Sequence, residues 1–214
     1  MDRFDPHRRL LAFATAGLAG YVDAIGFLSA DGYFVSFMSG NTTRLAVDIA
    51  DQPAQAVIPA LLITGFVGGV AGGTWLAQRA GRHRKPANFA LVGLLIAVAA
   101  LLRMSGHTGA SLGPLVFAMG AINTSFQREG SVAVGVTYMT GALVRLGEAL
   151  GAMLSGQRPK TNPTAHLLLW ASLATGAILG AVCLLHFQQA ALFMAVAWSA
   201  GLALAARALV RNAR

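Results

Sequence analysis

The chain has 214 residues, of which 56% are hydrophobic and only 11% are charged. Soluble domains carry roughly 25% charged residues, so this composition excludes a water-soluble domain with an ordinary charged shell. The formal net charge is +8, but the basic residues lie in short segments between apolar runs. This distribution is typical of the cytoplasmic loops of membrane proteins and argues against nucleic-acid binding.

Two long runs, residues 53–78 and 161–206, contain no charged residue. A helix needs about 20 apolar residues to cross a bilayer, so the second run can hold two crossings. The single cysteine, Cys183, lies in this run; it excludes an intramolecular disulfide and gives no metal-ligand spacing.

The N-terminus resembles a signal peptide, because Arg3, Arg8 and Arg9 precede an apolar stretch. That stretch continues to residue 30, which is long enough to span the membrane, so we expect it to be retained as the first helix. The apolar runs predict six spanning helices in chain order: 10–30, 53–78, 86–102, 112–127, 164–185 and 189–206. Between them lie two basic loops, 79–85 and 156–163, and a polar turn at 103–111.

Two less apolar segments, 32–51 and 131–155, carry nearly the same motif. FVSFMSGNTTRLAV (34–47) matches GVTYMTGALVRLGE (135–148) at five identical positions: Val35 and Val136, Met38 and Met139, Gly40 and Gly141, Arg44 and Arg145, Leu45 and Leu146. Similar residues such as Phe37 and Tyr138 face each other between them. Upstream, Asp23 matches Asn123. Downstream, glycines recur in both halves: Gly65, Gly69 and Gly73 face Ser172, Gly176 and Gly180. These features, in one order, predict an internal duplication.

Charge distribution predicts how the two copies are oriented. If both termini and both basic loops are cytoplasmic, the motif segments do not cross fully and each copy has three crossings. An odd number of crossings inverts the second copy relative to the first. We therefore expect an all-α, polytopic membrane protein with about six transmembrane helices, arranged as two inverted three-span repeats, 1–106 and 107–214. Each repeat has an additional non-spanning or broken motif helix, and the expected location is the bacterial inner membrane.

The segments GYVDAIGFL, FMSGNTTRLA and TYMTGALVRLGEAL resemble hallmarks of a family of bacterial membrane proteins of unknown function, DUF1275, also called the YoaK family. The resemblance covers essentially the whole chain. It implies a small polytopic membrane protein with about six spans, often guessed to be a transporter, and supplies neither a substrate nor a site.

The glycine motif is the first candidate site. Ser39 or Asn41 can cap a helix while Gly40 lets the backbone turn. Thr42 belongs to the same step, and Thr140 with Gly141 repeats it with less polarity. A helix that starts inside the membrane attracts anions or polar ligands to its free N–H groups. Alternatively, the glycine only allows close helix packing.

Charged residues follow each motif on one helix face. Arg44 and Asp48 are four residues apart, and Arg145 and Glu148 are three apart. We interpret both as intrahelical ion pairs, structural or involved in gating. Asp23 has no charged sequence neighbour, so we expect it to face Asn123, Asn41 or Thr42, or a hydrated cavity, as a proton or cation site. A packing hydrogen bond is the alternative.

The glycines of the predicted second and fifth spans form small-residue faces for helix packing: Gly65, Gly69, Gly73, Gly176 and Gly180. A homodimer through such a face is left open. The sequence has no HExxH, CxxC, GxSxG or P-loop pattern. We therefore expect no enzyme, cofactor or metal. The hypothesis is a secondary transporter, ion- or proton-coupled, for a small polar or anionic substrate. The alternative is a non-transporting structural or assembly protein.

Overall fold

The computed structural model describes residues 6–128, 131–132, 137 and 139–212. Arg3, Val136 and Tyr138, which the sequence analysis named, lie outside them. Within the described residues the chain forms eight α-helices: α1 (Pro6–Ser29), α2 (Met38–Asp51), α3 (Val57–Ala80), α4 (Arg84–Met104), α5 (Thr108–Ile122), α6 (Met139–Leu154), α7 (Pro163–Phe187) and α8 (Ala191–Asn212). Short 3-10 turns follow three of them: η1 (Gly81–His83), η2 (Asn123–Phe126) and η3 (Gln188–Ala190). Strands β1 (Gln127–Arg128) and β2 (Ser131–Val132) pair antiparallel after η2.

Local sequence explains where several helices begin and end. α7 starts with Pro163, whose missing N–H is not needed at a first helical position, and the side chain of Asn162 accepts a 3.0 Å bond from Thr164 N. α3 ends at Ala80, and its C-cap residue, Gly81, has a positive φ of 52°. A residue with a side chain rarely adopts that conformation, so glycine allows the tight turn through η1 into α4.

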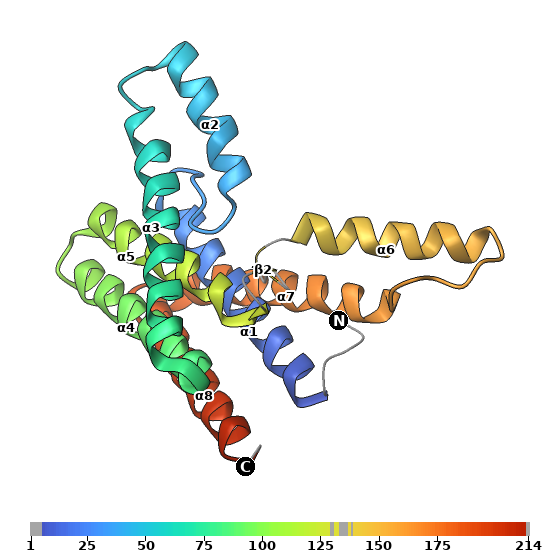
Figure 1. Cartoon of the computed structure of the whole chain (residues 1–214). Helices are drawn as coiled ribbons and strands as arrows, with labels where there is room; N and C mark the ends of the chain where they lie inside the picture. Colours follow the sequence, from blue (N-terminus) through green and yellow to red (C-terminus); the bar gives the residue numbers. More distant parts are fainter. Residues whose placement is uncertain (1–5, 129–130, 133–136, 138, 213–214) are drawn as a thin grey trace.

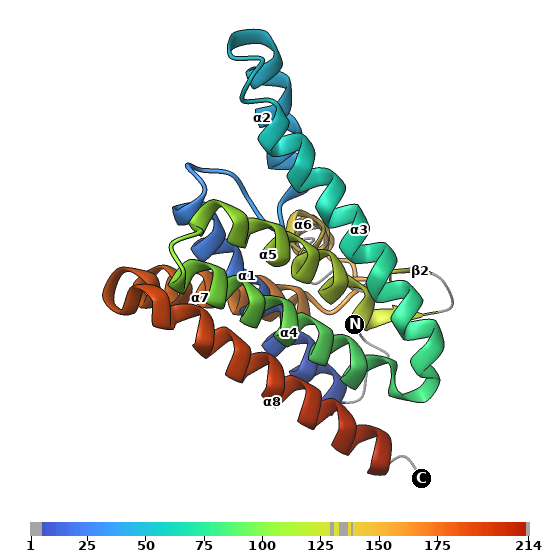
Figure 2. The ribbon, with the colours of Figure 1, turned by 90° about the vertical axis from the view of Figure 1, so that its left-hand side faces the viewer.

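Helices that are distant in sequence pack side by side. α1 runs along α7, α3 along α5, and α4 lies between α5 and α8. α2 folds back on α3, and α6 folds back on α7. These two hairpins project from the remaining helices in different directions (Figures 1 and 2). The largest fully buried side chains come mostly from α1, α4, α5 and α8, such as Leu18, Phe89, Met119 and Leu192.

The α1–α7 and α3–α5 interfaces contain matching glycine contacts, at positions that the sequence duplication aligns. A Cβ placed on Gly20 of α1 would collide with the carbonyl of Leu173 in α7; a Cβ on Gly120 of α5 would collide with that of Phe66 in α3. The reciprocal contacts also match, because Gly176 lies against the carbonyl of Gly17 and Gly69 against that of Phe117. The α1–α7 and α3–α5 interfaces are therefore built from equivalent glycines at equivalent positions.

Four segments of the described chain are long and apolar enough to cross a membrane: His7–Ser29, Val57–Met104, Pro163–Phe187 and Ala191–Arg211. The second contains α3 and α4, joined by the basic turn. Together they account for five of the six predicted spans. The fourth predicted span, 112–127, is not among them, because α5 is only 15 residues long and the chain continues as 3-10 turn and strand. α2 and α6, with 14 and 16 residues, are also shorter than the about 20 residues that a crossing requires.

Candidate functional site

Asp23 connects α1 to the segment that leads into α2. Its Oδ1 accepts bonds from the backbone nitrogens of Val35, at 3.0 Å, and Ser36, at 2.8 Å. Val35 is fully buried and lies against Gly26, one turn beyond Asp23, where a Cβ would stand 2.7 Å from the valine Cγ1. We expected Asp23 to face Asn123, Asn41 or Thr42. In these bonds its partners are instead the backbone N–H groups of Val35 and Ser36. A carboxylate is a strong acceptor for such donors, so Asp23 holds this segment in place.

Asn123 makes the corresponding contact in the second copy. Its Oδ1 accepts bonds from the Thr137 hydroxyl, at 3.1 Å, and from Thr137 N, at 3.4 Å, while its amide nitrogen donates to the carbonyl of Met119. Thr137 is the duplication partner of Ser36. Both copies therefore use the same position to hold the approach to the motif helix, once with a carboxylate and once with a neutral amide.

Asn41 fixes the same segment at a second point. Its side chain is completely buried, its Oδ1 accepts from Phe34 N at 2.9 Å, and its Nδ2 donates to Phe34 O at 2.7 Å. Ala142 occupies the equivalent place in the second copy and is buried as well. The amide of Asn41 is consumed by this pairing, so it is not available as a helix cap.

The predicted capping role of Ser39 or Asn41 is wrong. α2 begins at Met38, its N-cap residue is Phe37, and no side chain caps it. Ser39 lies exposed in the first turn, and the Thr42 hydroxyl bonds back to Met38 O at 2.9 Å. Gly40 serves a different purpose. A Cβ there would stand 2.5 Å from the ring of Phe37 and 3.0 Å from that of Phe34.

Aromatic packing explains the need for glycine at this step. The rings of Phe27 and Phe34 lie 4.8 Å apart between centroids, and those of Phe34 and Phe37 lie 5.2 Å apart in an edge-to-face arrangement. Such pairs are stabilising beyond their buried area. In the second copy, Thr140 is exposed and Gly141 is half-buried at the start of α6.

Tyr33 joins the two charged residues of the first motif. Its hydroxyl donates to Asp48 Oδ2 at 2.7 Å, and the Arg44 guanidinium lies 4.8 Å from the centre of its ring. Arg44 also donates to the carbonyl of Asp31 at 3.4 Å. Burial and the Asp48 carboxylate raise the pKa of Tyr33, so the phenol keeps its proton and remains a donor.

Tyr33 was missed by the sequence analysis, since it precedes Asp48 by 15 residues and no helical spacing connects them. Its presence changes the interpretation of Arg44 and Asp48, because each is bound to the tyrosine. In the second copy, Arg145 and Glu148 are both exposed on α6, and Val134 stands in place of the tyrosine. The direct ion pairs of both copies stay predictions.

Asn88 of α4 forms a further buried polar contact that the sequence did not indicate. Its Nδ2 donates to the carbonyl of Ala121 at 2.7 Å and to the Ser125 hydroxyl at 2.8 Å. Gly73 of α3 lies beside its Oδ1, where a Cβ would stand 3.1 Å away. The contact ties α4 to the end of α5, so the glycine face of α3 and this asparagine pack as one unit.

Within the described residues, no group of three or more His, Cys, Asp or Glu side chains could hold a metal ion.

Large apolar side chains are exposed on the long helices. Leu61, Ile178 and Leu204 are 65–67% exposed on α3, α7 and α8. Apolar side chains of this size on long helices need lipid around them. Together with the spanning segments, they define a polytopic helical membrane protein.

Comparisons with known proteins agree. The profile of the family "Protein of unknown function (DUF1275)" matches residues 11–205. A "UPF0700 transmembrane protein RA0705" of Rhizobium meliloti (strain 1021) is 40% identical over 185 residues, which cover 86% of this chain and 79% of that protein. No solved structure matches the chain. The chain belongs to the DUF1275 family of membrane proteins, as the motif resemblance predicted.

Proposed function

We propose that this protein is a secondary transporter in which protonation of Asp23 controls the segment leading to α2. One observation carries the proposal. Asp23 holds Val35 and Ser36 with a carboxylate, whereas its counterpart Asn123 holds Thr137 with an amide. Only the first copy can change its charge at this point. A duplicated scaffold with one titratable anchor is suited to coupling a proton to a movement of one half.

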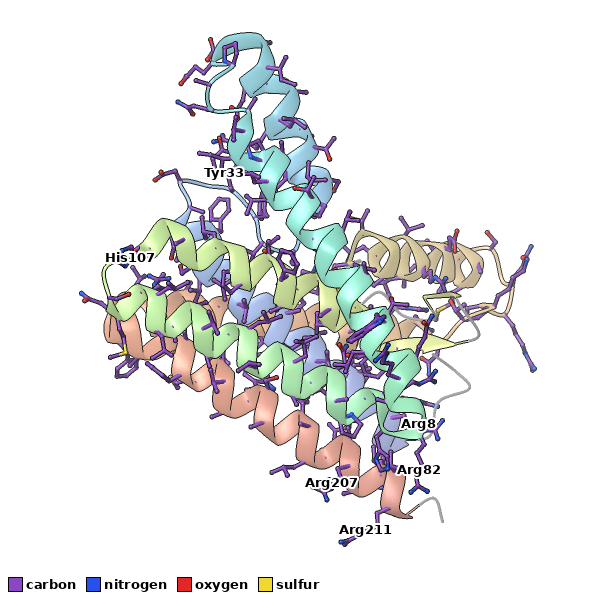
Figure 3. The ribbon with its side chains drawn as sticks, turned by 60° about the vertical axis from the view of Figure 1, so that its left-hand side comes forward. Arg8, Tyr33, Arg82, His107, Arg207 and Arg211 are labelled. Carbon is purple, nitrogen blue, oxygen red and sulfur yellow. The ribbon has the colours of Figure 1, made fainter. Side chains whose placement is uncertain are left out.

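The matched glycine contacts support an arrangement as two inverted repeats. In it, α1, α3 and α4 span in the first repeat and α5, α7 and α8 in the second, while α2 and α6 do not. α5 and η2 together contain 15 and 4 residues, hence 19, which is about the length of a crossing. The start of α1, the α3–α4 turn and the end of α8 lie at the same end of the molecule, as labelled by Arg8, Arg82 and Arg211 (Figure 3). This end is the cytoplasmic face in our proposal.

The chemistry of the switch follows from hydrogen-bond strength. Bonds to a charged acceptor contribute about 1.5–3 kcal/mol each, against about 0.5–1.5 kcal/mol for a neutral pair. Protonating Asp23 therefore weakens its hold on the two N–H groups by on the order of 1–3 kcal/mol in total. A change of that size shifts a two-state equilibrium roughly 5- to 150-fold. The released segment moves α2, whose exposed Ser39, Thr42 and Thr43 face a small polar or anionic substrate.

The second candidate is a structural or assembly role, favoured by Asn41. Its amide is fully buried and pairs with both backbone groups of Phe34. A segment fixed at this second point resists movement when Asp23 is protonated. The structural role predicts that changes at Asp23 and Asn41 alter stability alone.

An accessibility experiment separates the two candidates without a known substrate. Cys183 is replaced by alanine, cysteine is introduced at the exposed position of Ser39, and the maleimide labelling rate is measured in liposomes from acidic to neutral pH. At each pH, the labelling rate of the protein with Asp23 is divided by that of the Asp23→Asn variant. Both carry the same thiol, so the effect of its own titration cancels in this ratio. Transport predicts that the ratio of the two rates changes with pH. Equal rates throughout would favour the structural role.

The second copy provides the matched control. Asn123→Asp places a carboxylate beside the Thr137 hydroxyl. It should therefore make the labelling rate of a cysteine at the exposed position of Thr140 depend on pH. Once a substrate is identified, Asp23→Asn should retain the fold and abolish gradient-driven uptake. Unchanged uptake would remove Asp23 from the coupling mechanism.

A further inference from the structure

A cavity of about 430 Å³ opens where the beginning of α1, the turn between α3 and α4, and the last turns of α8 meet. Its lining comes from three distant parts of the chain: Arg8; Gly81, Arg82, Arg84 and Lys85; and Ala206, Leu209 and Val210. Its volume is within the usual range of small-molecule sites, about 300–1,000 Å³. Because the three parts converge only after folding, the sequence pattern of basic loops did not indicate this cavity.

One side of the cavity is strongly cationic. Arg8, Arg82, Arg84 and Lys85 all line it, and none of the described lining residues is acidic. Lys85 is held in position by packing its ammonium 4.8 Å from the ring centre of Phe126. The Nε of Arg82 donates to His83 at 3.1 Å. Four like charges gathered in one place repel each other, so an anion bound among them is stabilised.

The other side of the cavity is apolar. Ala206, Leu209 and Val210 lie three and four residues apart and form one face of α8. Figure 3 shows Arg207 and Arg211 at the same end of the molecule as Arg8 and Arg82, with His107 at the opposite end. Helix ends rich in arginine lie at the level of lipid headgroups. The site thus combines a cationic wall, an apolar wall and a position at the membrane surface.

We infer that this cavity binds the phosphate of an anionic phospholipid such as phosphatidylglycerol, with the first part of its acyl chains against α8. Guanidinium groups bind phosphate oxygens through paired N–H donors. Basic pockets between membrane helices are suited to such headgroups. A free phosphate ion would use only the cationic wall, and the apolar face of α8 therefore selects the lipid. The inference does not depend on transport or on Asp23.

Lipid binding is tested on the purified, delipidated full-length protein in neutral detergent. Native mass spectrometry and thermal unfolding are recorded against phosphatidylglycerol, phosphatidylcholine and inorganic phosphate. We expect phosphatidylglycerol to remain bound and to raise the unfolding temperature, and the other two to do neither. Equal effects of phosphatidylcholine, or an equal effect of phosphate alone, would overturn the assignment to an anionic lipid.

Matched variants locate the site. Arg82→Gln with Arg84→Gln should weaken phosphatidylglycerol binding at least about tenfold, since two charge-assisted contacts are lost. The control, Arg158→Gln with Lys160→Gln, removes the same charge from the exposed loop before α7 and should leave binding unchanged. Equal weakening in both would show a general charge effect and contradict the site. Arg84→Lys keeps the charge but loses the paired N–H donors of the guanidinium, so it should bind phosphatidylglycerol with intermediate affinity. It also serves as a control in case the double variant misfolds.

Discussion

The Oδ1 of Asp23 lies 2.8 Å from the backbone nitrogen of Ser36, 13 residues along the chain. An ionisable side chain of α1 is thereby bonded to the main chain of the segment that enters α2. Asp23→Asn retains an acceptor oxygen and should lose about 1 kcal/mol of unfolding free energy. Asp23→Leu leaves two backbone donors without their acceptor and should lose several times more. Unfolding in detergent measures both, and equal stability of the leucine variant would contradict the anchoring role.

The glycines of α3 should differ in their tolerance of substitution, because only some of them lie in close contact with another helix. Gly69→Ala should destabilise the protein strongly and reduce its folded yield, because the new methyl group collides with the backbone of Phe117. Gly72→Ala, three residues later, meets nothing within 4 Å and should be tolerated or slightly stabilising. Thermal unfolding of the pair checks this. In the repeated interface, Gly180→Ala should be disruptive, because its methyl group collides with the backbone of Tyr21. Gly201→Ala in α8 meets nothing within 4 Å and should be harmless.

Asn41→Ala should cost about 2–4 kcal/mol of stability, because it leaves the N–H and the C=O of the half-buried Phe34 without the amide that pairs with both. The neighbouring change Thr42→Ala removes an exposed hydroxyl bonded within its own helix and should cost less than about 0.5 kcal/mol. Chemical unfolding curves distinguish the two. If both variants were equally stable, the pairing with Phe34 would be of no consequence for the fold.

The bond between Tyr33 and Asp48 predicts a stability effect at alkaline pH. Because the pKa of Tyr33 is raised on folding, its contribution is complete below the ordinary tyrosine pKa of about 10 and is lost as the pH rises through the folded value. Tyr33→Phe should be less stable at neutral pH by about 1–3 kcal/mol, since Asp48 loses its donor. It should also show a smaller loss above pH ~10. An identical alkaline decline in both proteins would contradict this assignment.

Topology can be checked with single cysteines in a Cys183→Ala background. Cysteines at His83 and Arg158, both exposed, should resist a membrane-impermeant maleimide added to intact cells, because both basic loops are expected to be cytoplasmic. A cysteine at His107 should be labelled, since it lies at the opposite end of the molecule from Arg82 (Figure 3). Labelling at 83 or 158 would reject the inverted-repeat arrangement.

The helical fold and its repeated interfaces were predictable because their signals are periodic. Long uncharged runs mark the helices, and Gly69 and Gly176 recur in register with their neighbours. The limits of the runs were less accurate. The predicted span 112–127 extends past the end of α5, because the absence of charge in residues 123–127 does not distinguish an α-helix from the 3-10 turn that begins at Asn123.

The candidate site was predictable only in part. The sequence singled out Asp23 and Asn123, which do occupy corresponding positions. Their partners could not be identified, because Val35 and Ser36 contribute backbone N–H groups and every residue except proline has one. Tyr33 was missed for a related reason: its bond to Asp48 depends on how a loop folds back and not on a helical spacing.

The length of α5 bears on the electrical properties of the membrane around it. Its 15 residues rise about 22 Å, so the proposed crossing reaches the hydrocarbon thickness of about 30 Å only with the 3-10 turn η2 added. η2 contributes three polar side chains, Asn123, Thr124 and Ser125, to that end of the crossing. With α5 and η2 crossing as proposed, the fully apolar layer is thinnest there, and the membrane potential falls over its shortest distance. A charge moving beside α5 would therefore experience a steeper electric field than one at the lipid-facing perimeter.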